Sequence, residues 1–254
     1  MAERKRPEWI GRALQAHPDR EVFTVKEGEK RYWLKKGRAT GSTAIHSLGY
    51  RLTKLPFLRP VERKEASQSA RFEAEKLRRL GAKGLPVPAV VWEEEGFFVM
   101  EDRGESLAPR LKRVERTEAE PWLQQVAGAL ARLHRAGEYH GASQIRNFTL
   151  SEDGAVSLID FEESFPEDTS LEALQFRDLF LLLYSLHRQK QEADYPSMLQ
   201  HYMERSGNES FAEDLHRLYA RFRWLAAIVG VEGVRRRLGS DAQILHRLFE
   251  SLKR

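Results

Sequence analysis

The sequence predicts an α+β protein with two lobes, a small strand-rich N-lobe followed by a helical C-lobe. Two observations lead to this prediction. Short runs of β-branched and aromatic residues dominate up to about residue 100, whereas apolar residues recur at helical spacing in the segments after it. A pair of short strands that carries polar residues, within 147–160, interrupts the helical part. The 254 residues suffice for one compact unit or for two small lobes that share a cleft.

The predicted N-lobe, residues 1–100, contains a hairpin, a helix and a second pair of strands. Residues 21–36 alternate between apolar and polar side chains around a short turn, which is typical of a β-hairpin. Helix-forming residues dominate 63–80, and glycines close this helix. Prolines then introduce two short strands within 89–100. Residues 101–105 are predicted to be a hinge that leads to the second lobe.

The predicted C-lobe, residues 106–254, is mainly helical. Within 119–136, four large apolar residues recur at the spacing of one helix face: Trp122, Val126, Leu130 and Leu133. Two short strands, 147–150 and 156–160, follow this helix, and most of the chain from Leu171 onward is predicted to be helical.

Composition and charge exclude several classes of function. The chain has no cysteine, which excludes disulfides and thiolate metal sites. Its net charge is +4, and its basic residues are mostly interleaved with acidic ones, so DNA is not expected as a partner. The basic clusters are either solvated surfaces or binding sites for an anionic lipid, a phosphosugar or RNA. The sequence shows neither the apolar core of a signal peptide nor an apolar run of membrane-spanning length, which predicts a cytoplasmic location.

One segment carries a dense set of polar residues at informative spacing. His140 and Asn147 are seven residues apart, as His and Asn are in the pattern H-R-D-x-x-x-x-N. Asp160, thirteen residues after Asn147, opens the tripeptide Asp-Phe-Glu. Phosphoryl transfer from Mg-ATP requires oxygen ligands for the metal on two adjoining loops, so Asn147 and Asp160 are the predicted Mg²⁺ ligands. Alternatively, Asn147 is a turn residue and Asp160 a helix cap.

From about Arg20 to Arg188, the sequence resembles the lipopolysaccharide core heptose and Kdo kinase family, whose members are relatives of the RIO kinases. Besides the segment above, five further motifs carry the resemblance: Tyr32-Trp33-Leu34-Lys35, the basic and apolar stretch Leu52-Thr53-Lys54-Leu55-Pro56-Phe57-Leu58, Glu73 at eleven residues before Gly84, Phe98-Val99-Met100-Glu101, and Arg177-Asp178-Leu179. The resemblance implies a bilobal protein-kinase-like fold. It also implies ATP and Mg²⁺ as cofactors, and a sugar or a lipid-linked saccharide such as lipopolysaccharide core as the acceptor.

The resemblance also implies a role for each matching residue. Lys35 would hold the α- and β-phosphates, and Glu73 would orient it. The backbone near Met100 and Glu101 would contact adenine. Lys36 and Lys54 are the alternatives to Lys35, and a solvated helix face shared with Glu75 is the alternative for Glu73. The predicted catalytic residues are Asp160, His140 and Glu162, of which His140 would anchor its loop.

Two departures from the family pattern affect catalysis more than nucleotide binding. Ala142 stands where the family has the aspartate that accepts the proton of the substrate hydroxyl. General-base catalysis contributes about 10²–10⁴-fold, and the candidate substitutes are Glu162, Glu163, Ser143 and Gln144. No glycine-rich phosphate loop precedes Lys35. The second hypothesis is therefore a pseudokinase, a nucleotide-binding regulatory or scaffold module with little or no phosphotransfer.

Residues 45–59 alternate apolar and basic side chains. Such a segment suits either a surface that contacts the inner leaflet of the membrane, next to a lipid-linked acceptor, or a helix packed on the N-lobe. The sequence leaves the identity of the acceptor and the oligomeric state open.

Overall fold

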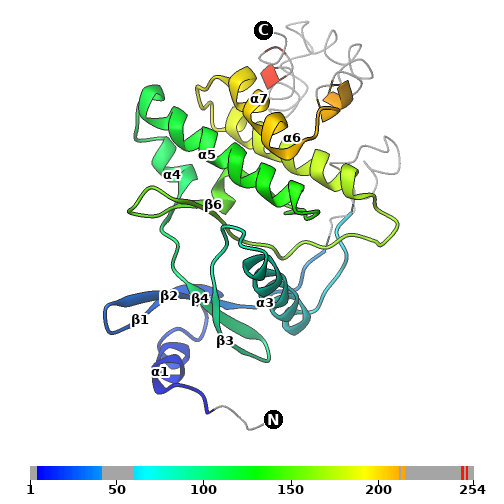
Figure 1. Ribbon diagram of the computed structural model, residues 1–254. Helices are drawn as coiled ribbons and strands as arrows, with labels where there is room; N and C mark the ends of the chain where they lie inside the picture. Colours follow the sequence, from blue (N-terminus) through cyan, green and yellow to red (C-terminus); the bar gives the residue numbers. More distant parts are fainter. Residues whose placement is uncertain (1–4, 42–59, 212, 216–246, 249, 251–254) are drawn as a thin grey trace, which may run out of the picture. The chain divides into compact units, whose positions relative to one another are not determined.

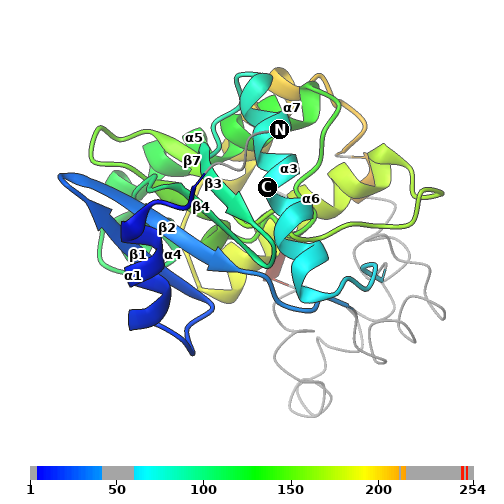
Figure 2. The same ribbon diagram turned by 90° about the horizontal axis from the view of Figure 1, so that it is seen from below.

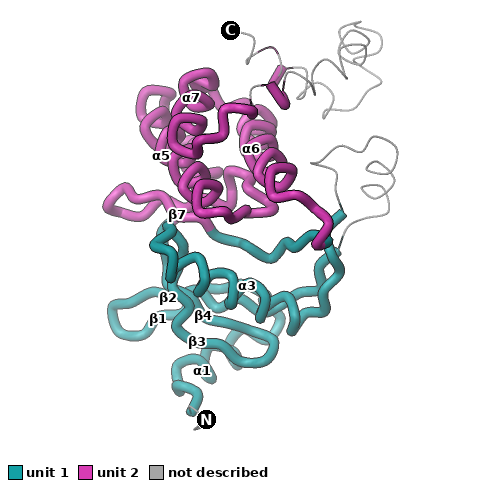
Figure 3. The backbone as a smooth tube through the Cα atoms, turned by 45° about the vertical axis from the view of Figure 1, so that its right-hand side comes forward, with its two compact units in different colours: residues 1–54, 58–104, 159–166 teal, residues 55–57, 105–158, 167–254 magenta. Residues whose placement is uncertain are grey.

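The computed structural model describes residues 5–41, 60–211, 213–215, 247–248 and 250. The chain forms two compact units (Figure 3). Unit 1 comprises residues 1–54, 58–104 and 159–166, and unit 2 comprises the remainder. The chain thus leaves unit 1 after Gly104, within the segment predicted to be the hinge. Residues 159–166, which the sequence assigned to the second lobe, are part of unit 1.

Unit 1 is built on a four-stranded antiparallel sheet in the order β1-β2-β4-β3. Its elements are α1 (Glu8–Ala16), β1 (Val22–Glu27), β2 (Lys30–Lys36), α3 (Ala66–Ala82), β3 (Val90–Glu94) and β4 (Phe97–Glu101). The hairpin, the helix and the second strand pair are present as predicted. Helix α1 was not predicted.

The two faces of this sheet carry different side chains, because successive strand residues point to opposite faces. On one face, Leu34 of β2 belongs to an apolar cluster that includes Ile10 of α1, and Trp9 stacks on Tyr32 with ring centroids 5.4 Å apart. In Figures 1 and 2, α1 lies along this face, and α3 lies on the other side of the sheet. The neighbour of Leu34, Lys35, therefore points toward α3.

Helix α3 begins at Ala66, three residues later than predicted, because the residues before it are tied to another segment. Lys64 forms a β-bridge with Thr40, so the chain is still extended at this point. Glu65 then caps the helix in a capping box with Gln68. Gly81 and Gly84 were both expected to close the helix: the helix includes Gly81 and ends at Ala82, and the chain turns at Gly84, whose φ is +71°.

Unit 2 combines a small sheet with packed helices. Its elements are β5 (Glu105–Ser106), α4 (Leu107–Leu111), α5 (Arg116–Arg135), the 3₁₀ turn η2 (Ile145–Asn147), β6 (Phe148–Leu150), β7 (Val156–Leu158), α6 (Leu171–Arg188) and α7 (Tyr195–Ser206). The sheet has the order β5-β6-β7. Within the described residues the α+β fold class is thus as predicted, with a strand-rich first unit and a mainly helical second unit.

The helices of unit 2 pack closely around buried apolar side chains. Helices α5 and α7 meet at Gly128, where an added Cβ would lie 3.2 Å from Nε2 of His201, so glycine allows the close approach. Helix α6 begins at the cap Ser170, whose side chain accepts a hydrogen bond from the N–H of Ala173. None of the helices in the described ranges is long and apolar enough to cross a membrane.

Candidate functional site

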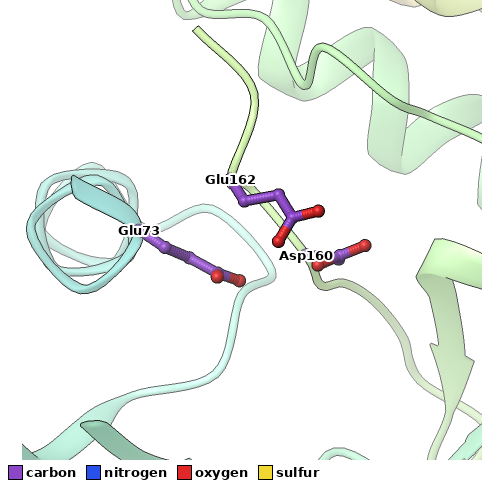
Figure 4. A group of neighbouring side chains, drawn as sticks. All are labelled: Glu73, Asp160 and Glu162. Atoms are coloured by element: carbon purple, nitrogen blue, oxygen red, sulfur yellow. The ribbon is translucent and has the colours of Figure 1, made fainter. Parts of the chain in front are cut away.

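Unit 1 brings one lysine and three carboxylates together. The Nζ atom of Lys35 lies 2.6 Å from Oε2 of Glu73, 2.5 Å from Oδ1 of Asp160 and 3.7 Å from Oε2 of Glu162. Figure 4 shows that Glu73 projects from α3, whereas Asp160 and Glu162 project from the segment after β7. Three of the residues predicted from sequence to hold nucleotide or metal, Lys35, Glu73 and Asp160, are therefore neighbours within one unit, together with Glu162.

The alternation of strand β2 decides which lysine reaches this cluster. Lys35 pairs with Phe98 of β4 and faces α3. Lys36 points away from the cluster, and its Nζ donates hydrogen bonds to the carbonyls of His17 at 2.9 Å and Pro18 at 2.7 Å. The geometry thus separates Lys35 from its rival Lys36, while Lys54 lies outside the described residues.

Glu73 connects three parts of unit 1. Its side chain is 1% exposed, and besides the Lys35 ion pair it accepts a hydrogen bond from the N–H of Phe161 at 3.2 Å. It therefore links α3, β2 and the segment after β7. Glu75, which the sequence alone did not separate from it, lies on the exposed side of α3 and pairs with Arg71.

Asp160 has a strained backbone. Its φ is +70°, in the left-handed region that few residues other than glycine adopt, although aspartate tolerates it better than most. The strand was predicted to extend to Asp160. The left-handed conformation of Asp160 explains why β7 ends at Leu158 instead. Strained residues concentrate at functional sites, where surrounding contacts hold them in place. Here those contacts include the Lys35 ion pair and the buried ring of the next residue, Phe161.

The charges of the cluster depend on one another. Burial by itself lowers the pKa of the Lys35 ammonium, but the carboxylates of Glu73, Asp160 and Glu162 together raise this pKa above its ordinary value. Burial raises the pKa of Glu73, and the nearby Lys35 opposes that shift. The cluster therefore holds a protonated lysine among carboxylates. Such an ammonium could release a carboxylate and bind another anion in its place.

The three acids also fit a hard divalent cation. One oxygen from each of Glu73, Asp160 and Glu162 lies within 4.8 Å of the other two. Carboxylate oxygens are the ligands that Mg²⁺ prefers. Glu73 was not predicted as a metal ligand, and its ion pair with Lys35 favours the orienting role. Asp160 remains the candidate ligand of this group, with Glu162 beside it.

In unit 2, the loop that carries His140 is fastened by Asp178 of α6. The carboxylate of Asp178 accepts hydrogen bonds from the N–H groups of His140, at 2.6 Å, and Gly141, at 2.8 Å, and it lies 3.3 Å from Nε2 of His134. Burial alone would raise the pKa of Asp178, but its interactions with His134 and His140 outweigh burial and hold the pKa below its ordinary value. His140 itself is fully buried, which favours the anchoring role over contact with a substrate.

Asn147 is fixed within the same loop of unit 2. Its Nδ2 donates a hydrogen bond to the carbonyl of Ala142 at 2.7 Å. Because the amide nitrogen is used by the loop, the amide oxygen is the atom that suits a metal ligand. The side chain of Ala142 cannot take up a proton, so the loop presents an oriented amide but no carboxylate at the position of the family's aspartate.

The proposed substitutes for that aspartate differ in their surroundings. Ser143 is buried, and its hydroxyl donates a hydrogen bond to the carbonyl of Asp178, so it is committed to the fold. Gln144 carries no basic group. Of the two glutamates, Glu162 is the one that lies in the Lys35 cluster.

The predicted adenine contacts lie at the end of β4. Met100 is buried, and the N–H of Glu101 donates a hydrogen bond to the carbonyl of Ala89 at 2.9 Å. This N–H is therefore used by the sheet, so an adenine contact at Glu101 would have to use its carbonyl.

Two features of unit 1 were missed by sequence reasoning. Arg38 forms an ion pair with Oε1 of Glu162. Lys64 donates a hydrogen bond to the hydroxyl of Ser164 at 2.6 Å, and this hydroxyl donates one to Glu62 at 2.8 Å. No sequence signal distinguishes these residues from other polar residues in loops, because each partner lies about 100 or more positions away.

Comparisons with known proteins found one matching family model and several similar proteins. A family model described as "Lipopolysaccharide kinase (Kdo/WaaP) family" matches residues 24–202. An uncharacterized protein of Haemophilus influenzae is 25% identical over 189 residues, which cover 74% of this chain and 71% of that protein. The human hormonally up-regulated neu tumor-associated kinase is 44% identical over 50 residues, which cover 20% of this chain and 7% of that kinase.

A solved structure is also similar. It is the Rio2 kinase-ADP/Mg²⁺-phosphoaspartate complex from Chaetomium thermophilum, with a TM-score of 0.46 and 14% sequence identity. The match covers 97% of this chain and 76% of that chain.

Proposed function

This chain belongs to the lipopolysaccharide kinase (Kdo/WaaP) family, and from that premise we propose that it transfers a phosphoryl group from ATP, with Mg²⁺, to a hydroxyl group of a sugar or lipid-linked saccharide such as lipopolysaccharide core. The observation that carries the proposal is the cluster of unit 1. Lys35 lies within ion-pair distance of both the α3 glutamate Glu73 and Asp160. A lysine, its orienting glutamate and a metal-binding aspartate are the parts that kinases use to hold a nucleotide.

Each residue has a defined task in this proposal. Lys35 binds the α- and β-phosphates as a point charge, and the buried Glu73 keeps its ammonium in place. Asp160 would hold Mg²⁺, with the amide oxygen of Asn147 as the further ligand expected from the sequence, and the ion would supply positive charge to the transferred group. Backbone groups near Met100 and Glu101 contact the adenine ring. The ammonium of Lys35 exchanges Asp160 for phosphate oxygens when the nucleotide binds, and Asp160 is then available to the metal.

A second candidate function follows from Ala142. A pseudokinase would keep Lys35, Asn147 and Asp160 for nucleotide binding and would transfer phosphate slowly or not at all. Loss of a general base costs about 10²–10⁴-fold in rate, which reduces turnover without preventing it. Glu162 is the carboxylate that we propose as the substitute base, because it lies in the same cluster as Asp160.

Nucleotide binding and turnover are tested by calorimetry and by an ADP-release assay. We expect ATP to bind tightly only with Mg²⁺, and turnover to rise when a core oligosaccharide is added. Asp160→Ala should abolish turnover, because it removes the metal ligand, whereas Asp19→Ala, which alters an exposed acid of unit 1, should leave it unchanged. Binding that is equal with and without Mg²⁺, or turnover that survives Asp160→Ala, would contradict this assignment. Binding without turnover would favour the pseudokinase.

For the acceptor, we propose a saccharide that is reached at the inner leaflet of the membrane. The support is the net charge of +4 together with the basic and apolar residues at 45–59, a segment that lies outside the described residues. Anionic lipid head groups would attract such a chain, and a peripheral position would bring it close to a lipid-linked acceptor.

A further inference from the structure

In the described part of unit 1, no glycine-rich loop precedes Lys35. Strands β1 and β2 are joined by a tight turn, in which Glu27 pairs with Lys30 and only Gly28 and Glu29 lie between them. This turn is short and carries acidic residues, so it does not offer the row of backbone N–H groups that a glycine-rich loop points at phosphates. A triphosphate therefore needs positive charge from another part of unit 1.

Arg38 lies where it can supply this charge. Its guanidinium binds Oε1 of Glu162, the carboxylate whose other oxygen lies 3.7 Å from Nζ of Lys35. Lys35 and Arg38 thus bind opposite oxygens of one carboxylate. The Arg38 side chain is 53% exposed, so it is accessible to a ligand.

The backbone around Arg38 is fixed on both sides. The N–H of Gly37 donates a hydrogen bond to the carbonyl of Gly96 at 2.8 Å, and Thr40 and Lys64 exchange two backbone hydrogen bonds, of 3.0 and 3.3 Å. Arg38 lies between these two anchors. The fold therefore holds the backbone of Arg38, while the contact with Glu162 directs its side chain to the cluster.

We propose that Arg38 is a second phosphate-binding residue, which exchanges the carboxylate of Glu162 for the terminal phosphate of the nucleotide. The proposal rests on the proposed function, since it concerns the same site. An arginine binds phosphate through two parallel N–H groups, as it binds carboxylate, whereas a lysine acts as a point charge. Lys35 lies near Oε2 of Glu162 and Arg38 binds Oε1, so the two cations meet different oxygens of this carboxylate, and the proposed function already gives the α- and β-phosphates to Lys35. We therefore assign the α- and β-phosphates to Lys35 and the terminal phosphate to Arg38.

The test is calorimetry of Mg·ATP and Mg·ADP binding to the full chain and its variants. Arg38→Met should weaken Mg·ATP about tenfold or more and Mg·ADP less than about threefold, because ADP lacks the phosphate that Arg38 binds. Arg38→Lys should recover only part of the loss. Arg71→Met, which removes an exposed arginine of α3 that pairs with Glu75, is the matched control and should change neither affinity.

A further variant tests the exchange itself. Glu162→Gln removes the carboxylate that competes with phosphate for Arg38, and Mg·ATP should then bind several-fold more tightly. Weaker binding by Glu162→Gln would overturn the exchange. Equal losses for ATP and ADP in Arg38→Met, or no loss, would overturn the assignment of Arg38. Failure of the wild-type chain to bind Mg·ATP would instead overturn the proposed function, so the two failures are distinguishable.

Discussion

At the residue scale, the pair formed by Lys35 and Glu73 joins stability to function. The Lys35 side chain is 11% exposed and that of Glu73 1%, so removal of the lysine leaves a buried carboxylate without its counter-charge. We expect Lys35→Met to lower the free energy of unfolding by about 3–5 kcal/mol at pH 7 in chemical denaturation. Lys35→Met combined with Glu73→Leu should recover most of the loss, since both charges are then absent. Unchanged stability of the single variant would mean that the pair is not buried as described.

Ala142 is the residue that separates an enzyme from a pseudokinase. If the loop is a degenerate catalytic loop, Ala142→Asp should raise ADP release about tenfold or more while nucleotide affinity stays similar. Asparagine is similar in size to aspartate but has no carboxylate that could act as a base, so Ala142→Asn serves as the control. If the wild type already turns over with its own acceptor, Ala142→Asp should give little gain, and this outcome would favour another base such as Glu162.

At the element scale, the end of β2 approaches the first turn of α3 so closely that only glycine fits. A Cβ on Gly37 would lie 1.8 Å from the carbonyl oxygen of Ala66, which belongs to the backbone and cannot rotate away. We expect Gly37→Ala to cost about 1–3 kcal/mol in the free energy of unfolding. Gly11→Ala in α1 is the contrasting change. An added Cβ there meets nothing within 4 Å, and the variant should be more stable by about 0.5–1 kcal/mol, because alanine favours a helix.

The hydrogen bonds between Asp178 of α6 and the loop that carries His140 predict how stability depends on pH. Folding lowers the pKa of Asp178 from its ordinary value of 3.8, so the ionised carboxylate stabilises the fold above pH 3.8, and this contribution is lost as the pH falls through the lowered pKa. Asp178→Asn should therefore reduce the free energy of unfolding by about 2–3 kcal/mol at both pH 7 and pH 5. The difference from wild type should shrink below pH 3.8. Urea denaturation at each pH measures it, and a difference that persists in acid would contradict the role of the charge.

At the scale of the whole molecule, the excess of positive charge predicts how the chain meets a membrane. With a net charge of +4, it should float with vesicles that contain anionic lipid at low salt, and it should be released as salt screens the attraction. Vesicles of neutral lipid are the control and should bind little. Absence of flotation with anionic vesicles at low salt would reject the inner-leaflet proposal.

Much of the architecture was predictable because it is encoded locally. The alternation in β1 and β2 and the helical spacing of Trp122, Val126, Leu130 and Leu133 depend on residues close together in the chain. The spacing of His140, Asn147 and Asp160 was informative for the same reason, since a short loop and a strand pair fix it. Helix α1 was missed because it has nine residues, of which Ile10 and Ala13 are buried, so its pattern of apolar residues is weak.

The sequence by itself thus determined the family, the α+β class and the candidate residues of the nucleotide site. Only the tertiary structure decided which of these residues meet. It selected Lys35 over Lys36, buried Glu73 while leaving Glu75 exposed, and joined Arg38 to Glu162. The physical reason is that local patterns fix the element and the face of each residue. An ion pair between residues more than 120 positions apart depends instead on how β2, α3 and the segment after β7 pack together.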